Sequence, residues 1–268
     1  MDWLVLPFTF PFMRDAALIA LIAAVPAALL SCFLVLRGWS LMGDAISHAV
    51  LPGIVLAWVA GLPLLIGAFA AGMICALASG WIEENSRVKP DTVLGVVMSG
   101  MFGLGVVLFT AIPSEIHLDH VLFGNILGAG PDDFASAGAI GLAVTATLVL
   151  KWRDFALLAF DPVQARVAGL PVRWLHYGLL AMISASVVAM LSAVGIILSV
   201  ALLIAPGAIA FLTTRRLPAM MAVATLSAVL AAGGGVWASF WLDSAPAPTI
   251  VLALTAMFVL AFARRQWQ

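Results

Sequence analysis

Residues 16–36 read AALIALIAAVPAALLSCFLVL and contain no charged side chain. A helix needs about 20 consecutive apolar residues to cross the hydrocarbon core of a bilayer. Apolar and polar residues do not alternate along this run, as they would in the strand of a membrane barrel. The stretch therefore predicts a membrane-spanning α-helix.

The same apolar character extends over the whole chain. Its 268 residues are 64% hydrophobic and 9% charged, with a net charge of −1, and the mean hydropathy is +1.18. Soluble domains are about 25% charged, and no soluble fold of this length could bury so much apolar surface. In lipid the backbone must satisfy its own hydrogen bonds. We therefore predict an all-α fold, a polytopic transmembrane helix bundle that forms one domain over residues 1–268.

Charged and turn residues divide the chain into eight or nine apolar segments. With nine spans, every Lys and Arg except Arg14 falls on one side of the membrane, which the positive-inside rule identifies as the cytoplasm. We then expect an external N-terminus, an external interfacial position for residues 1–13, and a cytoplasmic C-terminus. The predicted spans are 14–36, 39–60, 63–82, 92–112, 133–150, 175–194, 196–213, 218–242 and 249–263.

Two titratable side chains, Asp44 and His48, lie inside a predicted span. Burying an ionisable group in a bilayer costs several kcal/mol, so both are functional candidates. Their i, i+4 spacing places a carboxylate and an imidazole on one helix face, and these donors suit manganese, ferrous iron or zinc. Gly43, Pro52 and Gly53 indicate a kinked or locally opened helix, as found along transport pathways. The residues alone leave open an Asp–His hydrogen bond that only fixes one helix against another.

A second polar cluster falls in a predicted external loop. Glu115, His117, Asp119 and His120 offer four potential metal ligands within six residues. They could capture a metal ion at the external mouth. A solvated polar loop is the simpler interpretation.

The longest cytoplasmic connection, residues 151–174, contains one well-bounded short helix at 161–169. Asp161 can cap its N-terminus, Pro162 suits its first position, and Gly169 can end it. The middle residues of this helix are Gln164, Ala165 and Arg166. A short helix with clear start and stop signals is typical of a partner-docking helix, and an interfacial helix is the alternative. No GxxxxGK[ST] phosphate loop occurs in the chain, so ATP-driven transport would need a separate nucleotide-binding subunit.

Four segments together resemble one family of bacterial transporters. They are SLMGDAISHAVLPGIVLAW (40–58), HLDHVLFGNILG (117–128), DPVQARVAGLPV (161–172) and AVGIILSVALLIAPGAIAFL (193–212). The first closely resembles the signature of the ABC transporter permeases that import manganese, zinc and iron. The second is more similar to the manganese and iron branch than to the zinc branch.

The resemblance implies a fold similar to that of the vitamin B12 importer permease, in the cytoplasmic (inner) membrane of a bacterium. It implies a second permease, either identical or similar, two cytoplasmic ATPase subunits and an extracytoplasmic metal-binding protein. The family's metal-contacting residues in the pore correspond to Asp44 and His48, and its ATPase-coupling helix corresponds to 161–169. Manganese or iron would be cargo, so we expect no permanently bound cofactor and no enzymatic activity in this chain.

Three alternatives are weaker. Zinc is the closest alternative cargo. An ion-coupled secondary transporter would use Asp44 and His48 as a proton relay, but no convincing inverted repeat supports it, and the 161–169 helix would be unexplained. An intramembrane metalloenzyme would need a third internal ligand, and no HExxH motif occurs.

Overall fold

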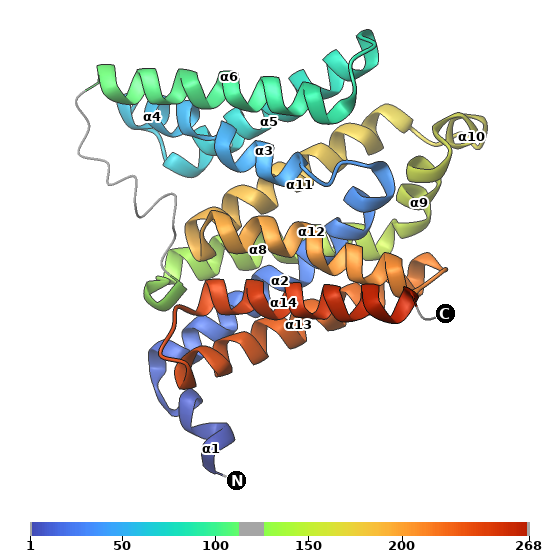
Figure 1. The fold of residues 1–268 in the computed structure, drawn as a ribbon. Coiled ribbons are helices and arrows are strands. Elements are labelled where there is room, and N and C mark those ends of the chain that lie inside the picture. Colours follow the sequence, from blue (N-terminus) through green and yellow to red (C-terminus); the bar gives the residue numbers. More distant parts are fainter. Residues whose placement is uncertain (1, 113–125, 267–268) are drawn as a thin grey trace.

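The computed structural model of the protein describes residues 2–112 and 126–266 (Figure 1). The described residues form helices and contain no strand. They include nine helical segments long and apolar enough to cross a membrane, which confirms the nine-span interpretation. The elements are α1 (Asp2–Val5), η1 (Leu6–Thr9), α2 (Pro11–Arg37), α3 (Met42–Ala49), α4 (Leu51–Val59), α5 (Leu64–Asn85), α6 (Pro90–Ala111), η2 (Ile126–Gly128), α8 (Pro131–Leu150), α9 (Trp152–Phe160), α10 (Pro162–Val167), α11 (Val172–Val194), α12 (Ile196–Thr213), α13 (Leu217–Trp241) and α14 (Pro246–Gln266).

Helix α2 forms the centre of the bundle. It packs against α8, α11, α12 and α13, and seven of its sixteen buried residues are alanines. Small residues let membrane helices approach closely, which gains packing energy where no hydrophobic drive exists between helices. Gly207 of α12 shows this closeness, because a Cβ there would lie 2.5 Å from the carbonyl oxygen of Ser31.

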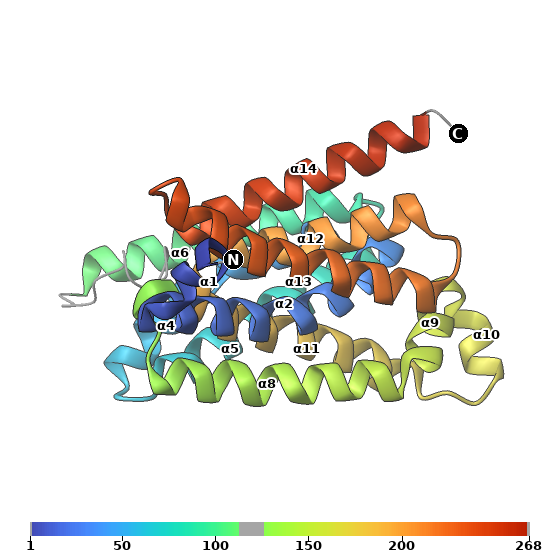
Figure 2. The ribbon, with the colours of Figure 1, turned by 90° about the horizontal axis from the view of Figure 1, so that it is seen from below.

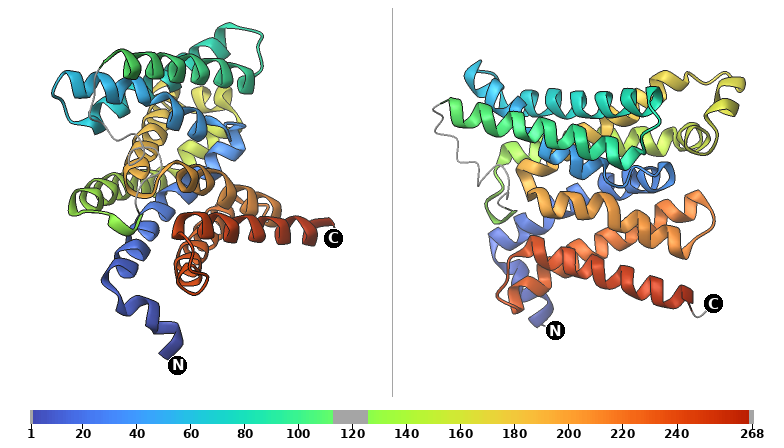
Figure 3. Two further views of the ribbon diagram at one scale, coloured as in Figure 1. Left: turned by 60° about the vertical axis from the view of Figure 1, so that its left-hand side comes forward. Right: turned by 45° about the horizontal axis from the view of Figure 1, so that its top comes forward.

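The remaining helices flank this centre. Helices α4, α5 and α6 pack together on one side of the bundle, and α13 and α14 lie on the other (Figures 1 and 3). In the view from below, α14 and α8 lie on opposite sides of the molecule (Figure 2). The alternating course of the spans brings α10, the C-terminal end of α14 and the turns at 86–89 and 214–216 to one end, which we call the basic end (Figure 1).

The end of α2 places the next helix inside the bundle. Gly38 adopts a left-handed φ of 71°, which glycine reaches without a steric penalty. The N–H of Trp39 donates to the carbonyl oxygen of Leu34 at 2.8 Å, and the N–H of Gly38 donates to that of Val35 at 3.2 Å. This Schellman motif satisfies the last carbonyls of α2 and reverses the chain. Helix α3 then packs against α5, α6, α11 and α12.

The span from Met42 to Val59 is interrupted. Helices α3 and α4 meet at Val50, two residues before Pro52, whose ring nitrogen cannot donate to the carbonyl oxygen of His48. The predicted irregularity is therefore present. A glycine pair lets α4 and α5 pack closely in the following hairpin. A Cβ on Gly53 of α4 or Gly67 of α5 would overlap the backbone carbonyl of the other.

Candidate functional site

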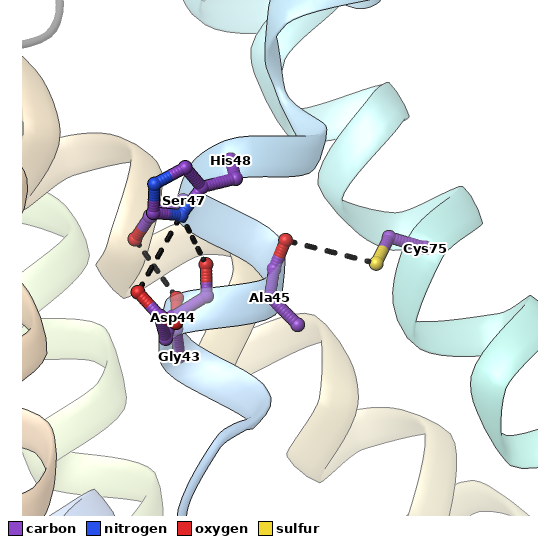
Figure 4. Close-up of polar contacts among 6 residues, drawn as sticks. All are labelled: Gly43, Asp44, Ala45, Ser47, His48 and Cys75. Carbon is purple, nitrogen blue, oxygen red and sulfur yellow. Dashed lines mark hydrogen bonds and ion pairs between the residues drawn. The ribbon is translucent and has the colours of Figure 1, made fainter. Parts of the chain in front are cut away.

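Asp44 and His48 lie one turn apart on α3 and contact each other (Figure 4). His48 Nδ1 is 3.1 Å from the backbone carbonyl oxygen of Asp44 and 3.4 Å from its Oδ1. A carbonyl oxygen only accepts hydrogen bonds, so Nδ1 carries the proton in the neutral ring. The Nε2 atom then holds the lone pair, which is the atom a metal ion would bind.

The surroundings of the pair fix the helix and the imidazole. The Ser47 hydroxyl donates to the carbonyl oxygen of Gly43 at 2.8 Å (Figure 4). A Cβ on Gly43 would lie 2.8 Å from Leu203 Cδ1, so glycine lets α3 lie close to α12. On the other side, the Phe102 ring of α6 meets the His48 ring edge to face, with centroids 5.8 Å apart. The imidazole is therefore oriented by Asp44 and by Phe102.

The pair is accessible and incomplete as a metal site. Both side chains are 36% exposed, although the neighbours Ala45, Ile46 and Ser47 are buried. Within residues 2–112 and 126–266, no group of three or more His, Cys, Asp or Glu side chains could hold a metal ion. The pair alone supplies one carboxylate and one imidazole from a single helix. Hydrated divalent ions usually take about six donors, so the others must come from water, backbone oxygens or another chain.

The second predicted cluster cannot be placed. Glu115, His117, Asp119 and His120 lie outside the described residues. Their contribution to an external mouth stays a prediction.

The segment predicted as a docking helix over 161–169 forms a shorter helix, Pro162–Val167, with the expected cap. Asp161 Oδ1 accepts hydrogen bonds from the N–H groups of Val163 and Gln164, both at 2.9 Å. Pro162 occupies the first position of α10, and Gly169 ends the segment with a φ of 78°. Ala165 is buried, while Val163 and Val167 are 69% and 85% exposed. One turn of α10 therefore presents two apolar side chains at the tip of the basic end.

Arg37 forms a junction between distant segments at the basic end. The sequence does not predict this junction, because there Arg37 serves only to indicate the topology. The guanidinium of Arg37 donates to the carbonyl oxygen of Leu158 at 3.2 Å and contacts His176 Nδ1 at 3.0 Å. It also lies 4.5 Å from the ring centre of Trp39, a cation–π distance. The junction connects the end of α2, the helix before α10, and α11. The only signal in the sequence is a polar residue at each of two span ends, which does not reveal that they meet.

The described residues combine nine helices long and apolar enough to cross a membrane, an interrupted helix that carries Asp44 and His48, and an exposed capped helix at one end. This arrangement is typical of a transport permease. The chain belongs to the ABC 3 transport family, whose model matches residues 9–265. It is a transport subunit and not an enzyme.

Relatives cover almost the whole chain. It is 52% identical to the chelated iron transport system membrane protein YfeD of Yersinia pestis over 255 residues, 95% of this chain and 86% of that protein. It is 42% identical to the manganese transport system membrane protein MntC of Halalkalibacterium halodurans, over 95% of this chain and 87% of that protein.

Two solved structures share the fold. PsaBC from Streptococcus pneumoniae in complex with Fab matches with a TM-score of 0.84 and 33% identity, over 97% of this chain and 94% of that chain. A putative metal-chelate type ABC transporter in an inward-facing conformation matches with a TM-score of 0.68 at 17% identity, over 94% of this chain and 85% of that chain, which supports the fold alone.

Proposed function

We propose that this chain is the membrane permease of an ATP-driven importer of Mn²⁺ or Fe²⁺. The observation that carries the proposal is the Asp44–His48 pair, which offers a carboxylate oxygen and a free Nε2 on an accessible helix face. Borderline divalent metals accept both donors. The relatives named for iron and manganese transport, at 52% and 42% identity, support this cargo.

A two-donor site suits transient contact. A closed cage of four protein ligands would hold the ion too tightly to release it, whereas a pathway needs binding that is weak enough to leave. A second permease, identical or similar, could supply an equivalent pair across a two-fold axis, because homo-oligomers place the same patch on both sides of such an axis. The 36% exposure of both side chains leaves them open to such a partner.

The basic end supports a proposal for the orientation and the energy source. We propose that this end faces the cytoplasm of a bacterial inner membrane, as the positive-inside rule predicts, and that α10 docks into a cleft on a cytoplasmic ATPase subunit. The exposed Val163 and Val167 would fill that cleft. An extracytoplasmic metal-binding protein would deliver the ion at the opposite end, where α6 ends at Ala111.

Metal uptake in cells lacking other metal importers tests the cargo. Cells expressing the chain with its ATPase should accumulate manganese and iron above cells that carry an inactive ATPase. Each of the two should inhibit uptake of the other, and zinc should compete poorly. Preferred accumulation of zinc would overturn the cargo assignment, and uptake that persists with the inactive ATPase would favour a secondary transporter.

A further inference from the structure

A large apolar groove, which neither Asp44 nor His48 lines, runs between α5 and α11 toward the basic end. Its volume is about 700 Å³, within the range of about 300–1,000 Å³ typical of ligand sites. Two glycines leave space in the groove because they lack a side chain. A Cβ on Gly178 would meet no atom within 4 Å, and one on Gly80 would meet only His176 Nε2, at 3.7 Å. The groove is lined by Met73, Leu77, Gly80, Trp81, Trp174, His176, Tyr177, Gly178, Leu180 and Ala181.

The length of the groove fits one leaflet of a bilayer. Both walls are membrane-spanning helices. Met73 and Trp81 are eight residues apart on α5, so the groove extends about 12 Å along the helix at 1.5 Å per residue. One leaflet contributes about 15 Å to a hydrocarbon core of about 30 Å. The length of the groove is therefore close to the thickness of one leaflet.

The mouth of the groove has the chemistry of a membrane interface. Trp81 and Trp174 are 68% and 81% exposed, and tryptophan concentrates at the level of lipid headgroups. Arg173 is exposed one turn before Tyr177, a groove residue of α11. A guanidinium at this position complements a phosphate, and basic residues at the cytoplasmic surface attract anionic lipids.

We propose that this groove binds one anionic phospholipid, with an acyl chain between α5 and α11 and its headgroup phosphate at Arg173. Near its mouth, the groove adjoins a smaller polar cavity of about 210 Å³, and Gly80 and His176 line both. Arg37, Trp39 and Glu83 also line the polar cavity. The bound chain would therefore stabilise α11 beside the junction that connects α2 to α9.

Native mass spectrometry of the purified full-length permease tests this site. The protein is first reconstituted in vesicles of equal phosphatidylglycerol and phosphatidylcholine. Wild-type protein should retain one phosphatidylglycerol after the detergent is removed. Gly178→Leu, which fills the groove, should lower this adduct at least tenfold. Gly233→Leu is the matched control, because Gly233, like Gly178, is a half-buried glycine in a span with open space around it, and it should retain the wild-type adduct.

A second variant keeps the test decisive if Gly178→Leu does not fold. Arg173→Gln changes only an exposed side chain and should abolish the preference for phosphatidylglycerol over phosphatidylcholine. An adduct unchanged in Gly178→Leu, or a lipid preference unchanged in Arg173→Gln, would overturn the proposal. So would a Gly178→Leu variant that keeps the lipid but changes the proportion of permease dimer, because the groove would then be a protein interface.

Discussion

Arg37, the last residue of α2, donates a hydrogen bond from its guanidinium to the carbonyl oxygen of Leu158 on α9, 121 residues further along the chain. Leu158 lies three residues before Asp161, the cap of α10. On the other side, Arg37 is followed directly by the Gly38 turn that leads to α3. A single side chain thus connects the end of the bundle that carries α10 with the turn before the Asp44–His48 helix.

Replacing Arg37 should loosen this connection. Arg37→Gln removes a charge-assisted hydrogen bond from a half-buried site, and we expect a loss of about 2 kcal/mol of stability. Arg37→Lys keeps the charge but lacks the planar fork, so its loss should be smaller. Thermal unfolding of the purified permease measures both. Arg14→Gln, at the other end of α2, is the control and should unfold as the wild type does; equal effects of the Arg14 and Arg37 variants would contradict the structural role of the junction.

The docking role of α10 predicts uncoupling at Gly169. Leucine at a φ of 78° costs about 1–2 kcal/mol of local strain, so Gly169→Leu should displace the end of the segment. In the reconstituted complex, we expect less metal transported per ATP hydrolysed. Gly61 offers a matched control, because it has a φ of 66° and, like Gly169, open space around it, but lies between α4 and α5. Gly61→Leu should leave the ratio of transport to hydrolysis intact, and an equal loss in both variants would point to strain alone.

The predicted external mouth can be tested through the concentration dependence of uptake. Imidazoles that capture metal should matter most when metal is scarce. Alanine at both His117 and His120 should therefore lower uptake several-fold at limiting manganese, with little change at saturating manganese. A concentration dependence identical to that of the wild type would indicate that these residues only form a solvated polar loop and do not capture metal.

The membrane spans and the short helix α10 are predictable from sequence because their signals are local. Apolar runs such as 16–36 reveal a span directly, and Asp161, Pro162 and Gly169 mark the ends of α10 by their own backbone preferences. The i, i+4 spacing of Asp44 and His48 likewise predicts their contact. All of these features depend on residues close together in the chain.

The rest depends on packing between distant segments. Arg37 and His176 are 139 residues apart, and nothing near either residue predicts their contact. The groove between α5 and α11 arises because Gly80 and Gly178 lie on facing walls, and isolated glycines occur in many membrane helices. The other ligands of the transported ion stay unpredicted for the same reason, since one helix supplies only Asp44 and His48.

Metal contact at His48 predicts a specific order of variants. His48→Ala removes Nε2 and should abolish most uptake. His48→Gln offers an amide oxygen, a weaker ligand for these metals than imidazole, so it should transport slightly more than alanine but far less than histidine. Manganese accumulation at matched membrane expression measures the order. Full activity of His48→Gln would indicate that the ring only packs against Phe102.

The central claim is that Asp44 contacts the transported ion, and manganese accumulation by Asp44→Asn tests it most directly. Asparagine keeps the size and a hydrogen-bond acceptor for His48 but removes the charge. Asp15→Asn, an exposed carboxylate on α2, is the control at matched membrane expression and should accumulate manganese normally. The metal-contact role predicts at least a tenfold loss for Asp44→Asn. Near-normal accumulation would contradict it and leave Asp44 and His48 as a pair that only fixes α3 in place.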